Sequence, residues 1–322
     1  MNAHTQQAWG YLLAAVTVFF WGITFVCTKY LLNSFSSLEI LFFRFLTAYL
    51  GLWIMHPRRE KIARSDNLLF ALAGLTGVVL YQLSENIAIH FTNASNVSVI
   101  VSICPLFTAI INQLFLKERS LSFCFLLGFL ISISGVVLVC FNGSTELAFN
   151  PKGDLLALFA GICWGFYSLC ISLINRRKYN SLCATRRIFF FAVLIMIPLT
   201  LFGWHLNARG STGTGINAGG SEAGSFISSL AFSFDRTLNA ARFANPLNCL
   251  NLLFLGLIAS GFCFAAWSKA CEKVGTVKVS CGLYLIPVVT VIFAFCTLGE
   301  RMTAAGAIGA LITIAGLFIS EH

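Results

Sequence analysis

One acidic side chain lies deep inside a long apolar stretch of this sequence. Glu85 falls within residues 68–90, and polar residues surround it: Tyr81, Gln82, Ser84 and Asn86. A carboxylate at membrane depth costs roughly 3 kcal/mol unless a partner, a ligand or water satisfies it. The turn therefore predicts one of two roles. Glu85 binds a cationic solute or a proton, or it forms a structural pair with Arg44 or Lys29.

Aromatic side chains recur at mid-depth in other apolar stretches. Indole and phenol rings can stack on a flat ring or face a cation. The alternative for Trp21 and Trp164 is packing between helices or contact with lipid, which must be the role of most of the 32 Phe. We expect a central substrate-binding region made of Trp21, Tyr81, Gln82, Glu85, Asn86, Trp164, Tyr167, Trp267 and Tyr284.

The chain that positions these residues is too apolar for a water-soluble globule. Of its 322 residues, 58% are apolar and 10% are charged, whereas roughly a quarter are charged in soluble proteins. Stretches of about 20 apolar residues cross the bilayer as helices. The sequence predicts an all-α polytopic membrane protein, not a β-barrel, with ten transmembrane helices over 9–32, 38–55, 68–90, 94–116, 122–141, 153–174, 187–204, 247–270, 276–298 and 303–320.

Basic residues in the short loops predict the orientation. With the N-terminus inside, ten Lys and Arg fall in cytoplasmic loops, and only Lys152 and Arg301 fall in outer ones. This bias predicts cytoplasmic termini. We expect the membrane to be the bacterial cytoplasmic membrane. The net charge of +9 forms no basic face interleaved with aromatics, which argues against a nucleic-acid partner. The expected partners are the lipid bilayer and a small-molecule solute, with the chain a monomer or weak dimer.

An internal repeat organises the chain. Trp21-Gly22 recurs as Trp164-Gly165 at an offset of 143 residues, and Pro105 recurs as Pro287 at an offset of 182. The difference between the two offsets is close to the length of a Gly/Ser-rich segment, 205–245, which we interpret as an extracytoplasmic insertion. Residues 9–141 and 153–320 are then two five-helix repeats. An odd number of crossings gives the repeats opposite polarity, an arrangement typical of alternating access; duplication without transport is the alternative.

Proline and charge also recur between the repeats. Pro105 and Pro287 fall near the middle of the fourth helix of each repeat, where proline removes a backbone hydrogen bond. We expect a gating break beside a cavity, because freed carbonyls need protein or water; a passive kink is the alternative. Structural rather than substrate contacts are expected for six charged residues: Arg44, Arg187, Glu118, Arg119, Glu300 and Arg301.

Several kinds of chemistry are missing from the predicted spans. All five His and the Asp residues lie at span ends or outside, so no dyad is available for acid–base catalysis or a metal. No nucleotide-binding motif is present. We therefore expect no cofactor, no metal and no enzyme activity, and we expect secondary active transport. A non-transporting membrane enzyme or scaffold is the alternative class.

The duplicated order of Trp-Gly, proline and Glu-Arg, followed by glycine-rich fifth and tenth helices, resembles the EamA branch of the drug/metabolite transporter superfamily. The resemblance implies ten helices in two inverted repeats, a central cavity and secondary transport by exchange or proton coupling. The polar turn at Glu85 and the insertion depart from that branch. Some EamA-like proteins carry S-adenosylmethionine, whose adenine would stack on Trp21 or Trp164 while its cation faces Glu85. An amino acid, a drug-like cation or a nucleoside, exported or imported, is the alternative solute.

Overall fold

The computed structural model describes residues 3–91, 94–117, 121–141, 150–211, 240–298 and 304–320, and every regular element in these ranges is helical. The first part of the chain forms α1 (Ala3–Leu31), α2 (Ser37–Met55), η1 (Arg64–Asp66), α3 (Asn67–Ala73), η2 (Gly74–Leu80), α4 (Tyr81–Phe91), α5 (Ala94–Val101), α6 (Cys104–Leu116) and α7 (Phe123–Phe141). The second part forms α8 (Pro151–Arg176), α9 (Ser181–Ser211), α12 (Ala240–Phe243), α13 (Pro246–Leu253), η3 (Phe254–Phe262), α14 (Cys263–Val274), α15 (Thr276–Cys281), η4 (Gly282–Leu285), α16 (Ile286–Leu298) and α17 (Ala304–Ser320).

Eight helical segments of the described chain are long and apolar enough to cross a membrane. Two further apolar helices, Phe123–Leu138 and Ala304–Ser320, are shorter. The predicted all-helical membrane fold is confirmed. The predicted count of ten crossings is supported by length for eight of them.

Polar side chains fix where several helices begin. Ser36 and Glu39 form a capping box at the start of α2, in which each side chain binds the backbone N–H of the other residue. Asn150 accepts hydrogen bonds from the first turn of α8, and Asn245 does the same for α13. In both cases proline follows at the first helical position, where its missing N–H has no helical partner to lose.

The seventh predicted span lies within a longer helix. The helix over predicted residues 187–204 runs from Ser181 to Ser211. Its start is set by Asn180, whose side-chain oxygen accepts hydrogen bonds from Leu182 N at 3.0 Å and Cys183 N at 3.4 Å. At the other end, helical backbone continues into the first residues of the predicted 205–245 insertion; residues 212–239 of that segment lie outside the described ranges.

The third and eighth predicted spans each contain a π-helical segment, which the sequence did not predict. The two segments, η2 and η3, occupy equivalent positions at the 182-residue offset. Each contains, at or near its start, a glycine that allows a neighbouring helix to approach closely: Gly74 is the first residue of η2 and Gly256 the third residue of η3. A Cβ atom at Gly74 would lie 2.8 Å from the Ile188 carbonyl oxygen of α9, and one at Gly256 would lie 3.1 Å from the Arg44 carbonyl oxygen of α2.

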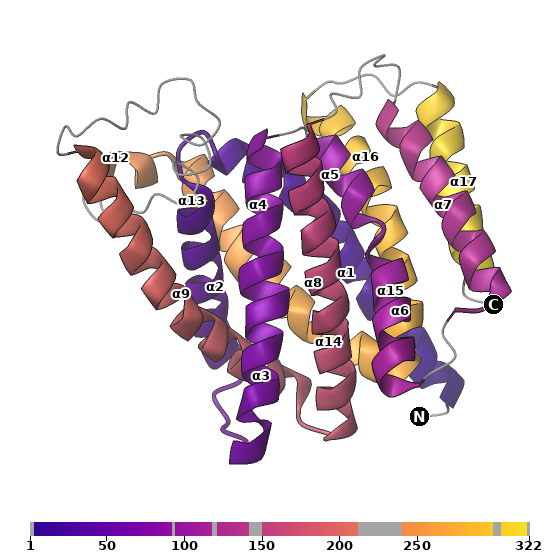
Figure 1. Cartoon of the computed structure of the whole chain (residues 1–322), viewed down its shortest axis with the longest axis horizontal. Helices are drawn as coiled ribbons and strands as arrows, with labels where there is room; N and C mark the ends of the chain where they lie inside the picture. The colour runs from indigo at the N-terminus through magenta and orange to yellow at the C-terminus, as the bar shows by residue number, and fades with distance from the viewer. Residues whose placement is uncertain are drawn as a thin grey trace.

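The helical elements pair in a repeated pattern (Figure 1). α1 packs against α14 and α16, and α8 packs against the equivalent α4 and α6. Likewise α2 contacts η3, α9 contacts η2, and α7 pairs with α17 at one edge of the bundle. We call the end where α1 begins the proximal end, at the bottom of Figure 1, and the end where α1 finishes the distal end.

Candidate functional site

Aromatic side chains from both parts of the chain meet at the centre of the bundle. The Trp21 ring of α1 lies 5.3 Å from Trp164 of α8 and 5.0 Å from Trp267 of α14, centroid to centroid. Trp164 lies 5.0 Å from Tyr81 and 5.1 Å from Tyr167. These five rings, which we call the aromatic layer, were all predicted to belong to the site.

The three indoles of the aromatic layer differ in their hydrogen bonds. Trp21 Nε1 donates to the carbonyl oxygen of Ala259, inside the π-helical η3, at 2.8 Å. Trp164 Nε1 and Trp267 Nε1 are buried and have no partner among the residues described. A buried donor without an acceptor is unfavourable by about 1–3 kcal/mol. Trp164 Nε1, whose ring borders the cavity described below, is therefore available to an incoming acceptor.

Arg44 joins the two parts of the chain on the distal side of the aromatic layer. Its side chain is 2% exposed. Arg44 Nε donates to Ser260 Oγ of η3 at 2.6 Å, and Nη1 donates to Gln82 Oε1 of α4 at 2.8 Å. Both bonds are directed by the planar guanidinium group. Arg44 thus makes two contacts between helices and also lines the cavity.

Glu85 lies one helical turn beyond Tyr81 and is 4% exposed. Its carboxyl group shares the wall of one cavity with Tyr81 and Arg44. Within the described ranges no ion pair as short as 4 Å joins Glu85 to Arg44. Lys29, the other partner considered from the sequence, instead donates to the Ile89 carbonyl oxygen at 3.1 Å.

A cavity lies between these groups. Its wall includes Trp21, Arg44, Tyr81, Gln82, Glu85 and Trp164. The space open to the centre of a water molecule is about 20 Å³, which is enough for a water molecule and far too little for a metabolite. A solute can therefore occupy this site only if the surrounding helices or rings move apart.

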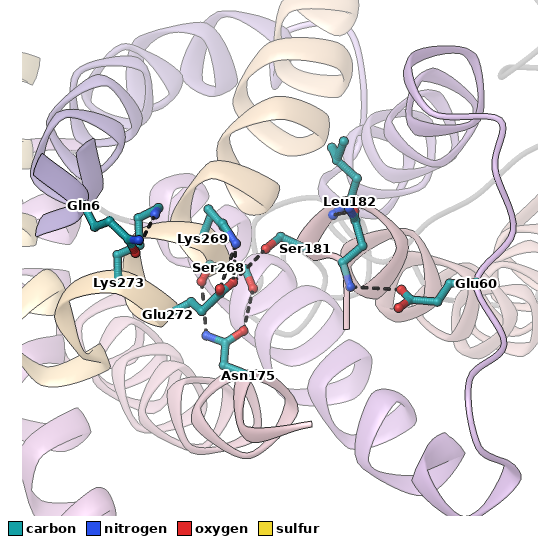
Figure 2. A network of polar contacts seen from close by, with 10 residues as sticks. Gln6, Glu60, Asn175, Ser181, Leu182, Ser268, Lys269, Glu272 and Lys273 are labelled. Carbon is teal, nitrogen blue, oxygen red and sulfur yellow. Dashed lines mark hydrogen bonds and ion pairs between the residues drawn. The ribbon is translucent and has the colours of Figure 1, made fainter. Parts of the chain in front are cut away.

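On the proximal side of the aromatic layer, polar contacts join α8 to α14 and α9 to α14 (Figure 2). Asn175 Nδ2 donates to the Ser268 carbonyl oxygen at 3.1 Å, and Ser268 Oγ donates to Asn175 Oδ1 at 3.3 Å. Lys269 forms an ion pair with Glu272 at 2.7 Å, and Ser181 Oγ donates to the same carboxylate at 3.5 Å. We call this set the proximal network.

Both predicted proline breaks coincide with interruptions of the α-helix. α5 ends at Val101, and α6 begins at Cys104 with Pro105 in its first turn. At the equivalent place the 3₁₀ segment η4 precedes α16, which begins just before Pro287. Ile286 of α16 lines the cavity, so one of the two breaks lies beside it.

Other predicted residues lie elsewhere. Tyr284 is fully buried in a separate cluster with Ala109, Phe125 and Cys281, away from the cavity. Asn86 is also fully buried, and its Nδ2 donates to the Ser37 carbonyl oxygen at 3.3 Å. The remaining predicted charges, Glu118, Arg119, Glu300 and Arg301, lie outside the described residues.

Arg187 does not repeat the contacts of Arg44, although it occupies the equivalent sequence position. Its Nη2 donates to Asn67 Oδ1 at 2.9 Å near the proximal end. The neighbouring Arg186 is the more buried of the two and binds the carbonyl oxygens of His56 and Arg58. The repeat carried no signal for Arg186, because its role depends on the path of the 56–63 loop.

A second contact without a sequence signal closes the distal end. Arg242, within the predicted insertion, forms an ion pair with Glu39 at 2.7 Å and lies over the Phe35 ring at 4.3 Å. Asn248 supports it by donating to the Arg242 carbonyl oxygen at 2.9 Å. No group of three His, Cys, Asp or Glu side chains in the part of the chain that the structure describes could hold a metal ion.

Apolar membrane-length helices, packed around a buried cavity with both charged and aromatic walls, define an integral membrane protein with a central polar site. The EamA-like transporter family model matches the chain twice, over residues 8–141 and 151–321. The chain therefore belongs to the EamA-like transporter family, which confirms the resemblance drawn from the duplicated motifs.

The relatives are named as transporters. An uncharacterized transporter of Archaeoglobus fulgidus is 27% identical over 99% of this chain and 98% of its own. A probable terminal-alkyne amino-acid exporter of Streptantibioticus cattleyicolor is 22% identical over 98% of this chain and 93% of its own. A solved crystal structure, 12% identical, superposes with a TM-score of 0.66 over 96% of this chain and 94% of that chain, which shows likeness of fold alone. The general role of this protein is transport.

Proposed function

We propose that this transporter moves a small cationic or zwitterionic solute of the amino-acid type by alternating access, as a secondary active carrier. The observation that supports this most directly is the pair of opposite charges in the cavity wall. Glu85 and Arg44 are both more than 95% buried there, at 4% and 2% exposure. Buried charges of this kind are retained chiefly where they serve a substrate or ion pathway.

The two charges suit the two ends of an amino acid. An α-ammonium or sulfonium group would face the Glu85 carboxylate, and an α-carboxylate would approach the Arg44 guanidinium group, which binds carboxylates with two parallel bonds. A flat or apolar side group would lie against Trp21 and Trp164. S-adenosylmethionine meets all three requirements and heads the solutes that we would test. The amino-acid exporter among the relatives supports the amino-acid type.

The repeated pairing of the halves supports alternating access. α1 with α14 and α8 with α4 are equivalent contacts on opposite sides of the aromatic layer, so loosening one pair while keeping the other would open one side at a time. We propose that the proximal end, with its basic 56–64 loop, faces the bacterial cytoplasm. Exchange drives the cycle in this proposal; a proton carried by Glu85 is the competing source of energy.

Counterflow in proteoliposomes tests the proposal. Vesicles loaded with unlabelled solute take up the labelled form without external energy if the protein is a carrier. The panel contains S-adenosylmethionine, lysine, leucine, adenosine and choline. Glu85→Gln should reduce exchange of the cationic solutes about 10- to 100-fold, because a charge-assisted contact is worth about 1.5–3 kcal/mol. Glu222→Gln, the same chemical change within the 205–245 segment, is the matched control.

The possible results test the role of Glu85, the class of solute and the source of energy. Exchange by the wild type and the Glu222→Gln variant, with loss in Glu85→Gln, supports the proposed site. Equal exchange by the wild type and both variants would remove Glu85 from the mechanism, although the protein would still be a carrier. If the wild type exchanges none of the panel, the amino-acid assignment fails. A dependence of wild-type exchange on an imposed pH gradient would favour proton coupling over simple exchange.

A further inference from the structure

A second cavity lies at the proximal end between α2 and the first turns of α9. It is much larger than the central one, with about 330 Å³ open to the centre of a water molecule. Its aromatic and basic walls are formed by Tyr49, Trp53, Arg59, Arg186, Arg187 and Phe190. None of these residues lines the cavity beside the aromatic layer.

Three guanidinium groups face this pocket, and two of them stack on one indole. Arg186 lies 3.8 Å above the Trp53 ring centroid and Arg59 lies 5.4 Å from it. Arg186 also donates to the carbonyl oxygens of His56 and Arg58, the latter at 2.7 Å. Arg186 therefore fixes the loop that carries Arg59. Arg59 itself makes no hydrogen bond or ion pair to another of the described residues.

Arg187 has unused hydrogen-bonding capacity. Nη2 donates to Asn67 at 2.9 Å, but the buried Nε has no partner in the described part of the chain. Arg187 also belongs to the segment Ser181–Phe202, which is apolar enough to span the membrane. A guanidinium group at that depth needs acceptors, because an unsatisfied buried donor on a charged group is costly.

The carboxylate in the wall does not neutralise these cations. Glu60 is the acidic residue that lines the pocket, and its Oε2 accepts a hydrogen bond from Asn180 N at the start of α9, at 2.9 Å. Among the residues the structure describes, no ion pair joins Glu60 to any of the three arginines. With three guanidinium groups and one carboxylate in its wall, the pocket has a net charge of +2.

The surface around the pocket shows where an anion would come from. Leu50 and Ile54 of α2 are 53% and 83% exposed, and Leu194 of α9 is 50% exposed. In a membrane protein such side chains face lipid tails. Trp53 and Tyr49 lie at the same end, in the pattern of aromatic residues at the level of lipid headgroups. The pocket thus lies beside lipid, and basic pockets between membrane helices are suited to anionic headgroups.

We propose that this pocket binds the phosphate group of an anionic phospholipid of the adjacent leaflet. Arg187 and Arg59 supply the direct contacts, and Arg186 holds the loop over the site. The acyl chains would follow the apolar surfaces of α2 and α9. This site is separate from the solute site, so it does not depend on the role of Glu85.

Native mass spectrometry of the purified protein, titrated with phosphatidylglycerol or phosphatidylcholine in detergent, tests the proposal. We expect saturable retention of phosphatidylglycerol by the wild type, and weaker retention of phosphatidylcholine. Arg187→Gln should weaken phosphatidylglycerol binding about tenfold, and Arg59→Gln about fivefold, as expected for loss of one basic group near the surface. Arg64→Gln removes a charge that, like Arg59, is exposed at the same end but lies outside the pocket, and this variant should bind like the wild type.

Three results would overturn the proposal. Unchanged lipid binding in both pocket variants would exclude the pocket. An equal loss in Arg64→Gln would show general attraction of the basic end rather than a site. Thermal stabilisation by millimolar inorganic phosphate, as large as that by the lipid and lost in the same variants, would make free phosphate the ligand. Arg59 is exposed, so Arg59→Gln keeps the test valid even if Arg187→Gln does not fold.

Discussion

α4 and α14 occupy equivalent places in the two parts of the chain and carry opposite chemistry. Both follow a π-helical segment, and each packs against the first helix of the other part. Gln82 and Glu85 of α4 correspond to Phe264 and Trp267 of α14 at the 182-residue offset. The same backbone arrangement therefore presents Gln82 and Glu85 to the cavity in one part and packs Phe264 and Trp267 against the Trp21 ring in the other.

The difference shows that the scaffold does not require the charge. Trp267 is fully buried among rings at the position equivalent to Glu85. The repeated backbone therefore does not itself demand an acid at residue 85. The polar contacts that these two helices make to the first helices differ as well: Asn175 of α8 and Ser268 of α14 exchange two hydrogen bonds at the proximal end, whereas Lys29 of α1 donates to the Ile89 carbonyl oxygen of α4 at the distal end.

Among the changes to the charged groups around α4, removal of Arg44 should have the largest effect on stability and on solute exchange. Arg44→Leu leaves Ser260 Oγ and Gln82 Oε1 without their donor and leaves Glu85 without its positive neighbour. We expect a loss of about 3–5 kcal/mol in the free energy of unfolding, as for other buried charges deprived of a partner, and solute exchange below detection. Thermal unfolding in detergent and counterflow measure the two effects.

Arg44→Lys is the matched control. It keeps the positive charge near Glu85 but cannot make both directed bonds of the guanidinium group. We expect it to recover more than half of the lost thermal stability and only part of the exchange. If Arg44→Leu were as stable and active as the wild type, the charged wall on α4 would have no functional role.

The indoles of the aromatic layer offer a smaller, paired test. Trp21→Phe and Trp267→Phe remove the same atoms, but only Trp21 loses a hydrogen bond, to the Ala259 carbonyl oxygen. Trp21→Phe should therefore be the more destabilising of the two by about 1–2 kcal/mol in unfolding free energy. Equal thermal midpoints would show that the bond into η3 does not contribute to stability.

The sequence predicted the features that depend on residue type along the chain. Apolar stretches predicted membrane helices, and the duplicated Trp-Gly and proline predicted related halves, because these signals need no knowledge of tertiary contacts. The interruptions beside Pro105 and Pro287 lie where the missing N–H predicts them. The aromatic layer also unites residues chosen from type and depth alone: Trp21, Tyr81, Trp164, Tyr167 and Trp267.

The features that depend on packing were not predictable. The π-helical segments have no local signal beyond a glycine, and each packs against a helix distant in the sequence, η3 against α2 and η2 against α9. Tyr284 has the right type and depth for the site, but the turn of η4 directs it into another cluster. The repeat predicted equivalent roles for Arg44 and Arg187. The residues around Arg187 at the proximal end, however, have no equivalent around Arg44.

The smallest predicted effect concerns the proximal network. Ser268→Ala removes the hydrogen bond from Ser268 Oγ to Asn175 Oδ1 and leaves the aromatic layer intact. Loss of about 1 kcal/mol from this closure should raise the population open at the proximal end about fivefold. Cys271, buried one turn further along α14, should then react correspondingly faster with a water-soluble maleimide, as quantified by peptide mass spectrometry.

Two references make that measurement specific. Cys124 is exposed on α7 and should label at one rate in every variant. Ser65→Ala, in an exposed position of η1, removes a hydroxyl group at the same end without touching the proximal network and should leave Cys271 protected. Suppose that Cys271 reacts no faster in Ser268→Ala than in Ser65→Ala. The hydrogen bonds between α8 and α14 then do not hold the proximal side closed, and the difference between the proximal and distal ends must lie in the aromatic layer itself.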